Sequence, residues 1–556
     1  MKALVCCLNS KYIHASLAPW CLAAGVNEYC ETSWDTKVLE STINSEIEPF
    51  INKITGENPQ VVAFCCYIWN IQKTLQICRE IKAKTDAVII LGGPEVAYRA
   101  KETLIEYQFI DYVLSGEGEE SFPQFLDGIT NGNILNTDGL TYRKEESVIS
   151  NPEKVYTGTP VSPYTKEFYE NLRGRICYIE TSRGCPYRCA FCLSGRCSPL
   201  RFFDIERVKE DILNLSVSGT QTIKFVDRTF NANSKRANEI LEFIISNYGD
   251  KIPNTVCFHF EIAGDILTEE TLNILASAPK GAIQLEIGMQ SFNEDTLKAI
   301  NRKTNTKKLI ENINKLISFQ NMHIHIDLIA GLTGEDIKSF EESFNIGYSL
   351  KAHMLQMGFL KLLYGAQMRE DTEKYPCEFS PEPPYEVTKT PWLSQSEILQ
   401  LKKCEDALER LYNSGRFLYT LDYLIEFCGY TPFKLFMEFG NAVDGSNMTL
   451  SNYADTVYNY FEPFTDKEIL REKILCDLLS SSYSAPIPKS LKIRDSLYKK
   501  VKKYFLEKYE GQTKIVILYK SNSAYVVNEN DEKDLHGRFK GKFFDLNDIA
   551  KWLGMA

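Results

Sequence analysis

The 556-residue sequence lacks several features that would place it in a membrane or on nucleic acid. It has no run of eighteen apolar residues, so we expect no membrane-spanning helix. Its N-terminus is typical of a first buried strand and not of a signal peptide. The formal net charge is −11, so the chain as a whole does not have the positive surface of a nucleic-acid-binding protein. Without a signal peptide, the seventeen cysteines predict a reducing cytoplasm and no disulfide bonds.

Three of these cysteines are closely spaced. Cys185, Cys189 and Cys192 follow a strand-like stretch in the order C-x3-C-x2-C. Three thiolates are too few to close a tetrahedral metal site, but they suit a four-iron, four-sulfur cluster whose fourth iron stays open. A zinc site with a fourth ligand and unrelated core cysteines are the alternatives. Cys197 could be a fourth ligand, a thiol near the substrate, or an ordinary loop thiol.

This spacing resembles that of the radical S-adenosylmethionine (radical SAM) superfamily, as do Arg183-Gly184 before the first cysteine and Phe191 before the third. The resemblance implies that the open iron chelates SAM through its amino and carboxylate groups. One-electron reduction of the cluster would then split SAM into methionine and a 5′-deoxyadenosyl radical. The resemblance also implies an external electron donor, such as a one-electron reductase, a flavodoxin or a ferredoxin.

Upstream of the cysteines, residues 1–135 alternate apolar strands with amphipathic helices. The expected strands are Ala3–Leu8, Val61–Cys66, Val88–Leu91 and Tyr112–Ser115. This alternation predicts a parallel, Rossmann-like sheet covered on both faces, and such sheets bind ligands at the carboxyl ends of their strands. Two loops there are rich in glycine, which lets a backbone approach a bulky ligand closely. They contain Gly92, Gly93, Pro94 and Glu95 after one strand, and Gly116, Glu117 and Gly118 after the next.

Together with the cysteine motif, these loops resemble the cobalamin-binding domain of cobalamin-dependent radical SAM enzymes, which implies that they contact cobalamin. Many such domains carry an Asp-x-His-x-x-Gly motif whose histidine ligates cobalt. The matching loop here contains Tyr12 and His14, both predicted cobalamin contacts, without that motif. His14 could ligate cobalt, or it could hydrogen-bond the corrin or the backbone. Tyr67 or Trp69 could instead lie below cobalt, or could simply pack in the wall.

Residues 136–170 form a polar connector that contains three prolines. Residues 171–390 then contain six strand-like stretches with helices between them, which predicts a six-unit partial (β/α) barrel, that is, a partial TIM barrel. The cysteine loop follows the first stretch, at the C-terminal mouth where such barrels place their chemistry. The stretches are Ile176–Ser182, Thr222–Phe230, Val256–Gly264, Ala282–Ser291, His323–Gly331 and Met354–Leu363.

Polar side chains occur at the ends of the later strands, where a purely structural strand would be apolar. Gly288–Phe292 and Asp327–Glu335 resemble segments that contact the ribose, adenine and methionine groups of SAM in radical SAM barrels. Asp227 could reach substrate instead, and any single acid here could be a solvated or ion-paired strand end. A His-x-His-x-Asp line at residues 323–327 could alternatively ligate a metal. The resemblance implies these SAM contacts: Phe191, Asp227, Glu261, Glu286, Gln290, Asp327, Ile329 and Leu332.

Residues 391–556 follow a proline-rich stretch and have mainly helical patterns, with a short strand pair expected at Lys514–Tyr519 and Ala524–Val527. Ten Lys or Arg and three Asp or Glu lie between Lys489 and Lys520, with aromatic residues among them. This segment could form a nucleic-acid-binding face, or simply the solvated side of an amphipathic helix. We expect this domain to select the substrate, but the sequence contains no motif that identifies that substrate.

The sequence therefore resembles a cobalamin-binding radical SAM enzyme over residues 1–390, and its C-terminal part resembles the domain of unknown function found in one branch of that family. The resemblance implies a class B type C-methyltransferase that uses a 4Fe-4S cluster, SAM and cobalamin. The radical would abstract hydrogen from an unactivated carbon, and methylcobalamin would donate the methyl group. A non-methylating radical enzyme, acting for example on a tRNA base, and a non-catalytic iron–sulfur sensor are the alternatives. The substrate could be a small molecule, a peptide or tRNA.

Overall fold

A computed structural model describes residues 1–196, 199–482 and 486–553. Cys197 lies outside the described residues. The chain divides into two compact units. The first comprises Met1–Leu285, Lys298–Asn305 and Leu360–Thr388, and the second comprises Glu286–Leu297, Thr306–Phe359 and Lys389–Ala556. Among the described helices, none is long and apolar enough to cross a membrane.

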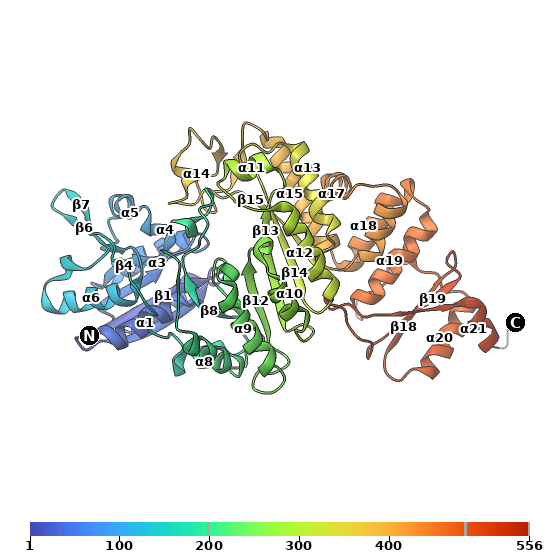
Figure 1. Ribbon diagram of the computed structural model, residues 1–556, viewed down its shortest axis with the longest axis horizontal. Helices are drawn as coiled ribbons and strands as arrows, with labels where there is room; N and C mark the ends of the chain where they lie inside the picture. The colour runs from blue at the N-terminus through green and yellow to red at the C-terminus, as the bar shows by residue number, and fades with distance from the viewer. Residues whose placement is uncertain (197–198, 483–485, 554–556) are drawn as a thin grey trace. The chain divides into compact units, whose positions relative to one another are not determined.

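The first unit begins with a seven-stranded sheet in the order β2-β1-β3-β4-β5-β6-β7 (Figure 1). The first five strands are parallel, and β6 and β7 are antiparallel. The four predicted strands are all present. The additional edge strand β2 was not predicted, because most of its residues are only partly buried and its pattern is weak. The strands are β1 Lys2–Asn9, β2 Asp35–Thr42, β3 Val61–Cys65, β4 Val88–Gly92, β5 Tyr112–Leu114, β6 Leu140–Lys144 and β7 Ser147–Ser150.

One prediction about this region is wrong. Residues 136–170 are not only a connector, because β6 and β7 extend the N-terminal sheet. Strand β7 is polar because it is the edge strand and its residues are partly or fully exposed, and that composition is easily mistaken for a linker. Helix α7, Lys166–Leu172, follows before the barrel begins.

Helices cover both faces of the N-terminal sheet, as the strand–helix alternation predicts. Alternate residues of β1 face opposite sides, so Ala3, Val5 and Cys7 join one core while Leu4, Cys6 and Leu8 join the other. All six are at most 1 % exposed, as expected for a central parallel strand. Helices α1 (Ala18–Tyr29) and α6 (Gly118–Asn131) pack on the first side, and α2 (Ile47–Gly56), α3 (Ile71–Lys84) and α5 (Ala100–Glu106) on the second.

The six predicted barrel strands are present and follow one another in the order β8-β11-β12-β13-β14-β15. The pairings of β8 with β11, β11 with β12 and β14 with β15 are parallel. Helices α8 to α13 lie between the strands along the chain, with both α11 and α12 between β13 and β14. The strands are β8 Cys177–Ile179, β11 Thr222–Phe225, β12 Cys257–Ile262, β13 Ile283–Gln290, β14 His323–Ala330 and β15 Met354–Phe359. The helices are α8 Ile205–Ser216, α9 Ser234–Asn247, α10 Glu269–Ala276, α11 Glu294–Ala299, α12 Thr306–Phe319 and α13 Ile337–Ser349.

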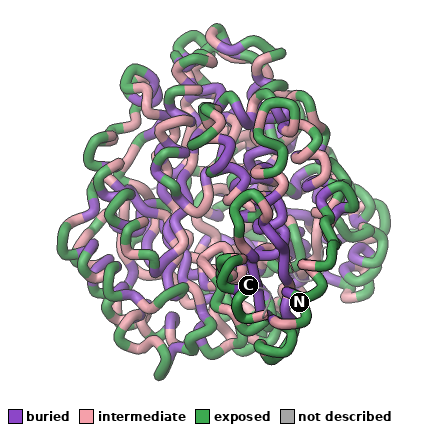
Figure 2. Tube along the Cα trace, turned by 90° about the vertical axis from the view of Figure 1, so that its right-hand side faces the viewer, coloured by how far each residue is buried: buried purple, intermediate pink, exposed green. Residues whose placement is uncertain are grey.

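The second unit ends in a mainly helical region and a small sheet. The predicted strand pair is confirmed as β18 (Thr513–Leu518) and β19 (Ser523–Asn528), and an unpredicted third strand, β20 (Lys542–Asp545), pairs with β19. Helices α20 (Ser496–Lys508) and α21 (Leu546–Trp552) share an apolar core with this sheet. Buried stretches of the trace alternate with exposed turns (Figure 2). The preceding helices are α15 Gln395–Leu408, α16 Leu418–Asp422, α17 Pro432–Ala442, α18 Leu450–Phe461 and α19 Lys467–Ser481.

Candidate active site

The three closely spaced cysteines lie on a loop that is anchored at both ends. Two short strands, β9 (Ser182–Arg183) and β10 (Arg201–Phe202), pair antiparallel at its base. Cys189 is buried, while Cys185 and Cys192 are half-buried, and all three are free thiols. The Sγ atom of Cys185 lies 3.4 Å from Thr229 Oγ1. The loop therefore presents three unpaired thiols from a fixed base.

These thiols suit a cluster with several metal atoms. Among the described residues, no three His, Cys, Asp or Glu side chains converge on one metal ion. A four-iron cluster does not need three ligands on one metal ion, because each of three separate irons binds one thiolate. Arg302 Nη1 also lies 3.8 Å from the Sγ atom of Cys189, a donor that suits a thiolate. The loop therefore fits the predicted cluster.

Asp227 holds the strand that leads into this loop. Its carboxylate accepts hydrogen bonds from the Thr181 amide (3.0 Å), the Thr181 hydroxyl (2.7 Å) and the Ser182 hydroxyl. Burial raises the pKa of Asp227 to about 6. Both oxygens thus accept hydrogen bonds from the chain, and the predicted contact of Asp227 with SAM or substrate stays a prediction. Asp227 instead fixes the backbone immediately before Arg183.

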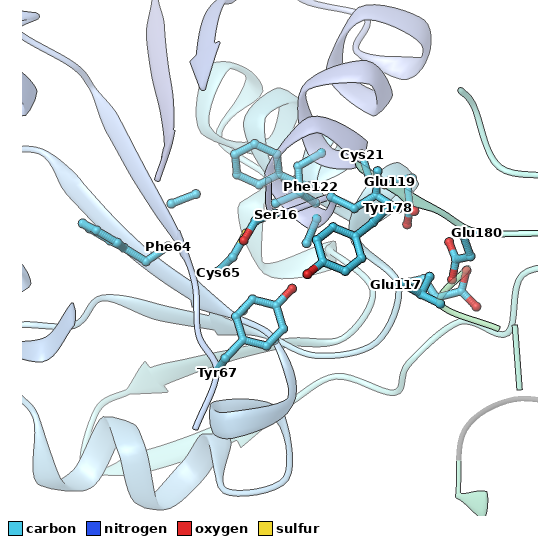
Figure 3. A pocket seen from close by; sticks show the side chains of 18 of the residues that line it. Ser16, Cys21, Phe64, Cys65, Tyr67, Glu117, Glu119, Phe122, Tyr178 and Glu180 are labelled. Carbon is cyan, nitrogen blue, oxygen red and sulfur yellow. The ribbon is translucent and has the colours of Figure 1, made fainter. Parts of the chain in front are cut away.

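A cavity of about 690 Å³ lies at the carboxyl ends of β1, β3, β4 and β5 (Figure 3). The sequence did not identify several of its other lining residues, including Tyr178 and Lys224 from barrel strands β8 and β11. Glu261, predicted as a SAM contact, also lines it. The predicted cobalamin contacts that line it are His14, Tyr67, Trp69, Gly92, Gly93, Gly116, Glu117 and Gly118.

Three predicted cobalamin contacts do not line the cavity. Tyr12 is 74 % exposed and packs its ring on the guanidinium of Arg175. Pro94 and Glu95 begin the short helix α4 (Pro94–Ala97), and Glu95 is buried with its carboxylate bonded to the Tyr385 hydroxyl. Burial raises the pKa of Glu95. Helix α4 begins directly after Gly93 and turns the Glu95 side chain into the protein, while Pro94 stays exposed; the cobalamin contacts of these three residues stay predictions.

Aromatic rings form one wall of the cavity. The rings of Tyr67 and Trp69 stack with centroids 4.4 Å apart and planes 4° apart. The indole of Trp69 donates a hydrogen bond to the Leu8 carbonyl oxygen (3.2 Å), which fixes its orientation. Figure 3 shows the hydroxyl groups of Tyr67 and Tyr178 pointing toward each other. A fixed aromatic pair of this kind can pack flat against a planar ligand.

His14 is held by the barrel. Its Nδ1 lies 2.7 Å from the Tyr178 hydroxyl, and burial lowers the pKa of the imidazole. The hydrogen bond that the structure shows joins His14 to a side chain of β8, a partner that was not among the predicted alternatives. No sequence motif could have revealed that partner, which is 164 positions away.

The glycines of the two loops are required by the packing of the chain itself. A Cβ atom on Gly93 would come within 2.5 Å of the Cys66 carbonyl oxygen, and one on Gly118 within 2.3 Å of a Leu22 methyl carbon. Gly93 and Gly116 also have positive φ angles of +104° and +84°. Glycine is thus needed at Gly93 and Gly118 because another part of the protein itself packs closely against their backbone.

Arg183 connects the cysteine loop to the cavity. Its guanidinium forms two hydrogen bonds of 2.9 Å with Glu180 and ion pairs with Glu117 and Glu119. Arg201 forms a second ion pair with Glu117. Burial alone would raise the pKa of Glu117, but the guanidinium groups of Arg201 and Arg183 hold it below its usual range. These five side chains, here called the Arg183 network, fasten the loop that begins α6 to both strands at the base of the cysteine loop.

Family models match three successive segments of the chain. The B12 binding domain matches residues 4–126, the radical SAM superfamily matches residues 179–346, and a protein of unknown function (DUF4080) matches residues 373–539. The chain belongs to the cobalamin-binding radical SAM family. The predicted family and its C-terminal branch are confirmed, and the predicted cofactors are those of the two matched domain families.

Curated relatives and solved structures agree with this assignment. The chain is 26 % identical over 332 residues to the 2-(S-pantetheinyl)-carbapenam-3-carboxylate methyltransferase of Streptantibioticus cattleyicolor, covering 53 % of this chain and 45 % of that protein. It is 26 % identical over 314 residues to the cobalamin-dependent radical SAM methyltransferase TokK of Streptomyces tokunonensis, with the same coverage. The chain thus spans about half the length of these relatives. The structure of OxsB, a cobalamin-dependent SAM radical enzyme, has the same fold, with a TM-score of 0.58, 14 % identity, and coverage of 86 % of this chain and 75 % of that one.

The remaining predicted SAM contacts of the radical SAM domain lie on β13 and β14. Glu286 and Gln290 share the partly exposed face of β13, and Asp327 and Ile329 share the corresponding face of β14. Leu332 follows the end of β14 and is fully buried. Phe191 is half-buried in the cysteine loop. The SAM roles of these residues stay predictions.

A buried acid supports the loops after these strands. Glu335 is fully buried and accepts hydrogen bonds from the hydroxyls of Ser291 (2.5 Å) and Ser343 (3.2 Å). Burial raises its pKa to about 7.

In the His-x-His-x-Asp line, Asp327 lies 3.1 Å from His325. The third member, His323, instead packs its ring against His353 at 5.1 Å.

Proposed function

We propose that this protein is a cobalamin-dependent radical SAM enzyme that methylates an unactivated carbon. One observation carries the proposal: Arg183, two positions before the first cysteine of the cluster motif, lines the cavity at the carboxyl edge of the B12-binding sheet. The bound cofactors would supply radical hydrogen abstraction and a transferable methyl group. The relatives named as methyltransferases support methylation over other radical chemistry.

The residues of the chain would bind and orient these groups. Cys185, Cys189 and Cys192 would hold the cluster, and the Tyr67–Trp69 pair would pack against the corrin. The Arg183 network would hold the cysteine loop in a fixed position relative to the cavity, because its ion pairs are largely shielded from water. The free state of all described cysteines supports a reducing cytoplasmic setting. The electron would come from an external flavodoxin, ferredoxin or reductase.

The test uses the anaerobically purified, iron- and sulfide-reconstituted protein. We expect an iron–sulfur absorption band, binding of hydroxocobalamin, and formation of 5′-deoxyadenosine from SAM under reductant. Incubation with SAM carrying a CD3 group should transfer the label to cobalamin and, in a metabolite extract, to a substrate carbon. SAM cleavage without any labelled methyl transfer would favour the non-methylating alternative. Undiminished cleavage in Cys189→Ala would contradict the cluster assignment.

A second candidate, modification of a tRNA base, is favoured by helix α20. Between Lys489 and Lys508 there are eight Lys or Arg and two Asp or Glu in a chain whose net charge is −11. Val501 and Phe505 face the core of the small sheet, which leaves the basic side chains in solvent. The exposed basic residues are Lys489, Lys492, Arg494, Lys499, Lys500, Lys502, Lys503 and Lys508. Such a surface complements a phosphate backbone.

Binding of total tRNA at several salt concentrations tests this candidate. Reversing the charge of Lys499, Lys502 and Lys503 together should weaken binding and lower the log–log salt slope by about 2 to 3. The matched control reverses three lysines that are exposed on α12: Lys307, Lys308 and Lys315. Equal effects of the two triple variants, or no tRNA binding by the wild type, would exclude α20 as an RNA-binding surface.

A further inference from the structure

The loop between α11 and α12 reaches the cysteine loop. The Ile300 carbonyl oxygen accepts a hydrogen bond of 2.8 Å from the amide of Ala190, which directly follows Cys189. On the other side, the Ala190 carbonyl oxygen accepts a hydrogen bond of 3.0 Å from the amide of Met368. The backbone next to Cys189 is therefore held from two directions by segments more than one hundred residues away.

This arrangement brings Arg302 to the cysteine. Asn301 has a positive φ of +57°, and its side-chain amide donates to Gln367 Oε1 at 3.2 Å, which fixes the turn. The Nη1 atom of Arg302 then lies 3.8 Å from the Sγ atom of Cys189, within hydrogen-bonding distance of sulfur. The next residue, Lys303, is exposed.

A donor and a positive charge at this position affect electron transfer. The reduction potential of an iron–sulfur cluster depends on its net charge and on hydrogen bonds to its sulfur atoms. Reduction adds one negative charge to the cluster, so a nearby fixed cation stabilises the reduced form more than the oxidised form. A guanidinium is suited to this task because it stays charged throughout the accessible pH range.

We propose that Arg302 tunes the reduction potential of the cluster by hydrogen bonding to the Cys189 thiolate and placing a fixed positive charge beside it. The inference rests on the proposed function, since it requires that the three cysteines hold a cluster. It assigns a role to a residue outside the cysteine motif and outside the predicted SAM contacts.

The test is a redox titration of the reconstituted protein without SAM, followed by electron paramagnetic resonance of the reduced cluster. Arg302→Met should shift the midpoint potential to more negative values. Arg302→Lys, which keeps the charge but loses the planar fork, should shift it less. Lys303→Met removes the same charge one residue away and should leave the midpoint unchanged.

Several outcomes would overturn the inference. A midpoint in Arg302→Met equal to that in Lys303→Met would show that Arg302 does not act on the cluster. A shift that occurs only when SAM is present would assign Arg302 to SAM and not to the thiolate. If Arg302→Met fails to assemble a cluster, the midpoint potential of Arg302→Gln, whose side chain is a neutral donor, is compared with that of Lys303→Met instead. Failure of the wild type to assemble any cluster would overturn the proposed function as well, which separates the two claims.

Discussion

Removal of the Arg183 guanidinium should loosen the first unit selectively. Arg183 is the shared partner of Glu117, Glu119 and Glu180, whose side chains are 19 %, 9 % and 21 % exposed. Removing one member of a buried ion pair costs about 3–5 kcal/mol, because the remaining charge stays in a poorly solvated place. Arg201 still neutralises Glu117, so we take the lower limit of about 3 kcal/mol for Arg183→Met.

Hydrogen–deuterium exchange with mass spectrometry measures this loss where it occurs. A loss of about 3 kcal/mol corresponds to exchange about one hundredfold faster, since each 1.36 kcal/mol is a factor of ten. We expect this increase at the start of α6 and at the base of the cysteine loop in Arg183→Met. Arg183→Lys should give a smaller increase, because an ammonium group cannot match the fork of a guanidinium.

The matched control for this experiment is Arg188→Met. Arg188 lies in the same loop, is exposed, and carries the same charge. The double variant Arg183→Met/Glu119→Gln should exchange more slowly than Arg183→Met, because it removes one of the buried carboxylates that lost its ion-pair partner. Equal exchange in Arg183→Met and Arg188→Met would refute the reasoning that the network holds the loop.

Three further predictions concern a buried acid, a half-buried histidine and the aromatic pair. Burial raises the pKa of Glu335 to about 7, so the folded protein loses stability as the pH rises from the unfolded-state pKa through 7. In Glu335→Gln this loss should be about 3 kcal/mol smaller, measured by urea denaturation between pH 5 and 8. Burial lowers the pKa of His353 to about 4, so stability is lost as the pH falls from 6.5 to 4. His353→Asn keeps an acceptor for the Ile324 amide and should reduce that acid sensitivity by about 3 kcal/mol, measured as urea midpoints from pH 7 to 4. Trp69→Ala should weaken hydroxocobalamin binding about tenfold in absorbance titrations, because aromatic stacking is lost, whereas Trp552→Ala should leave binding unchanged. The first two predictions would be contradicted by an unchanged pH dependence of stability, and the third by an unchanged affinity for hydroxocobalamin.

The sequence by itself determined the local features of this protein. The alternation of apolar strands and amphipathic helices is set by short-range periodicity, and it placed all six barrel strands and four of the parallel N-terminal strands. The spacing of Cys185, Cys189 and Cys192 is also local, because three ligands of one cluster lie on a single loop. Weak patterns were missed for the same reason: β2 and β7 are edge strands whose partly or fully exposed residues obscure the periodicity.

Only the tertiary structure decided which polar side chains meet. Asp227 and Glu95 look like ligand contacts in the sequence, and the structure shows that their carboxylates accept hydrogen bonds from Thr181, Ser182 and Tyr385. Arg183 gained its role from glutamates more than sixty positions away, and Arg302 reached Cys189 across 113 positions. Such pairings depend on the three-dimensional path of the chain, and a carboxylate at a strand end carries no local signal of whether a ligand or the protein will satisfy it.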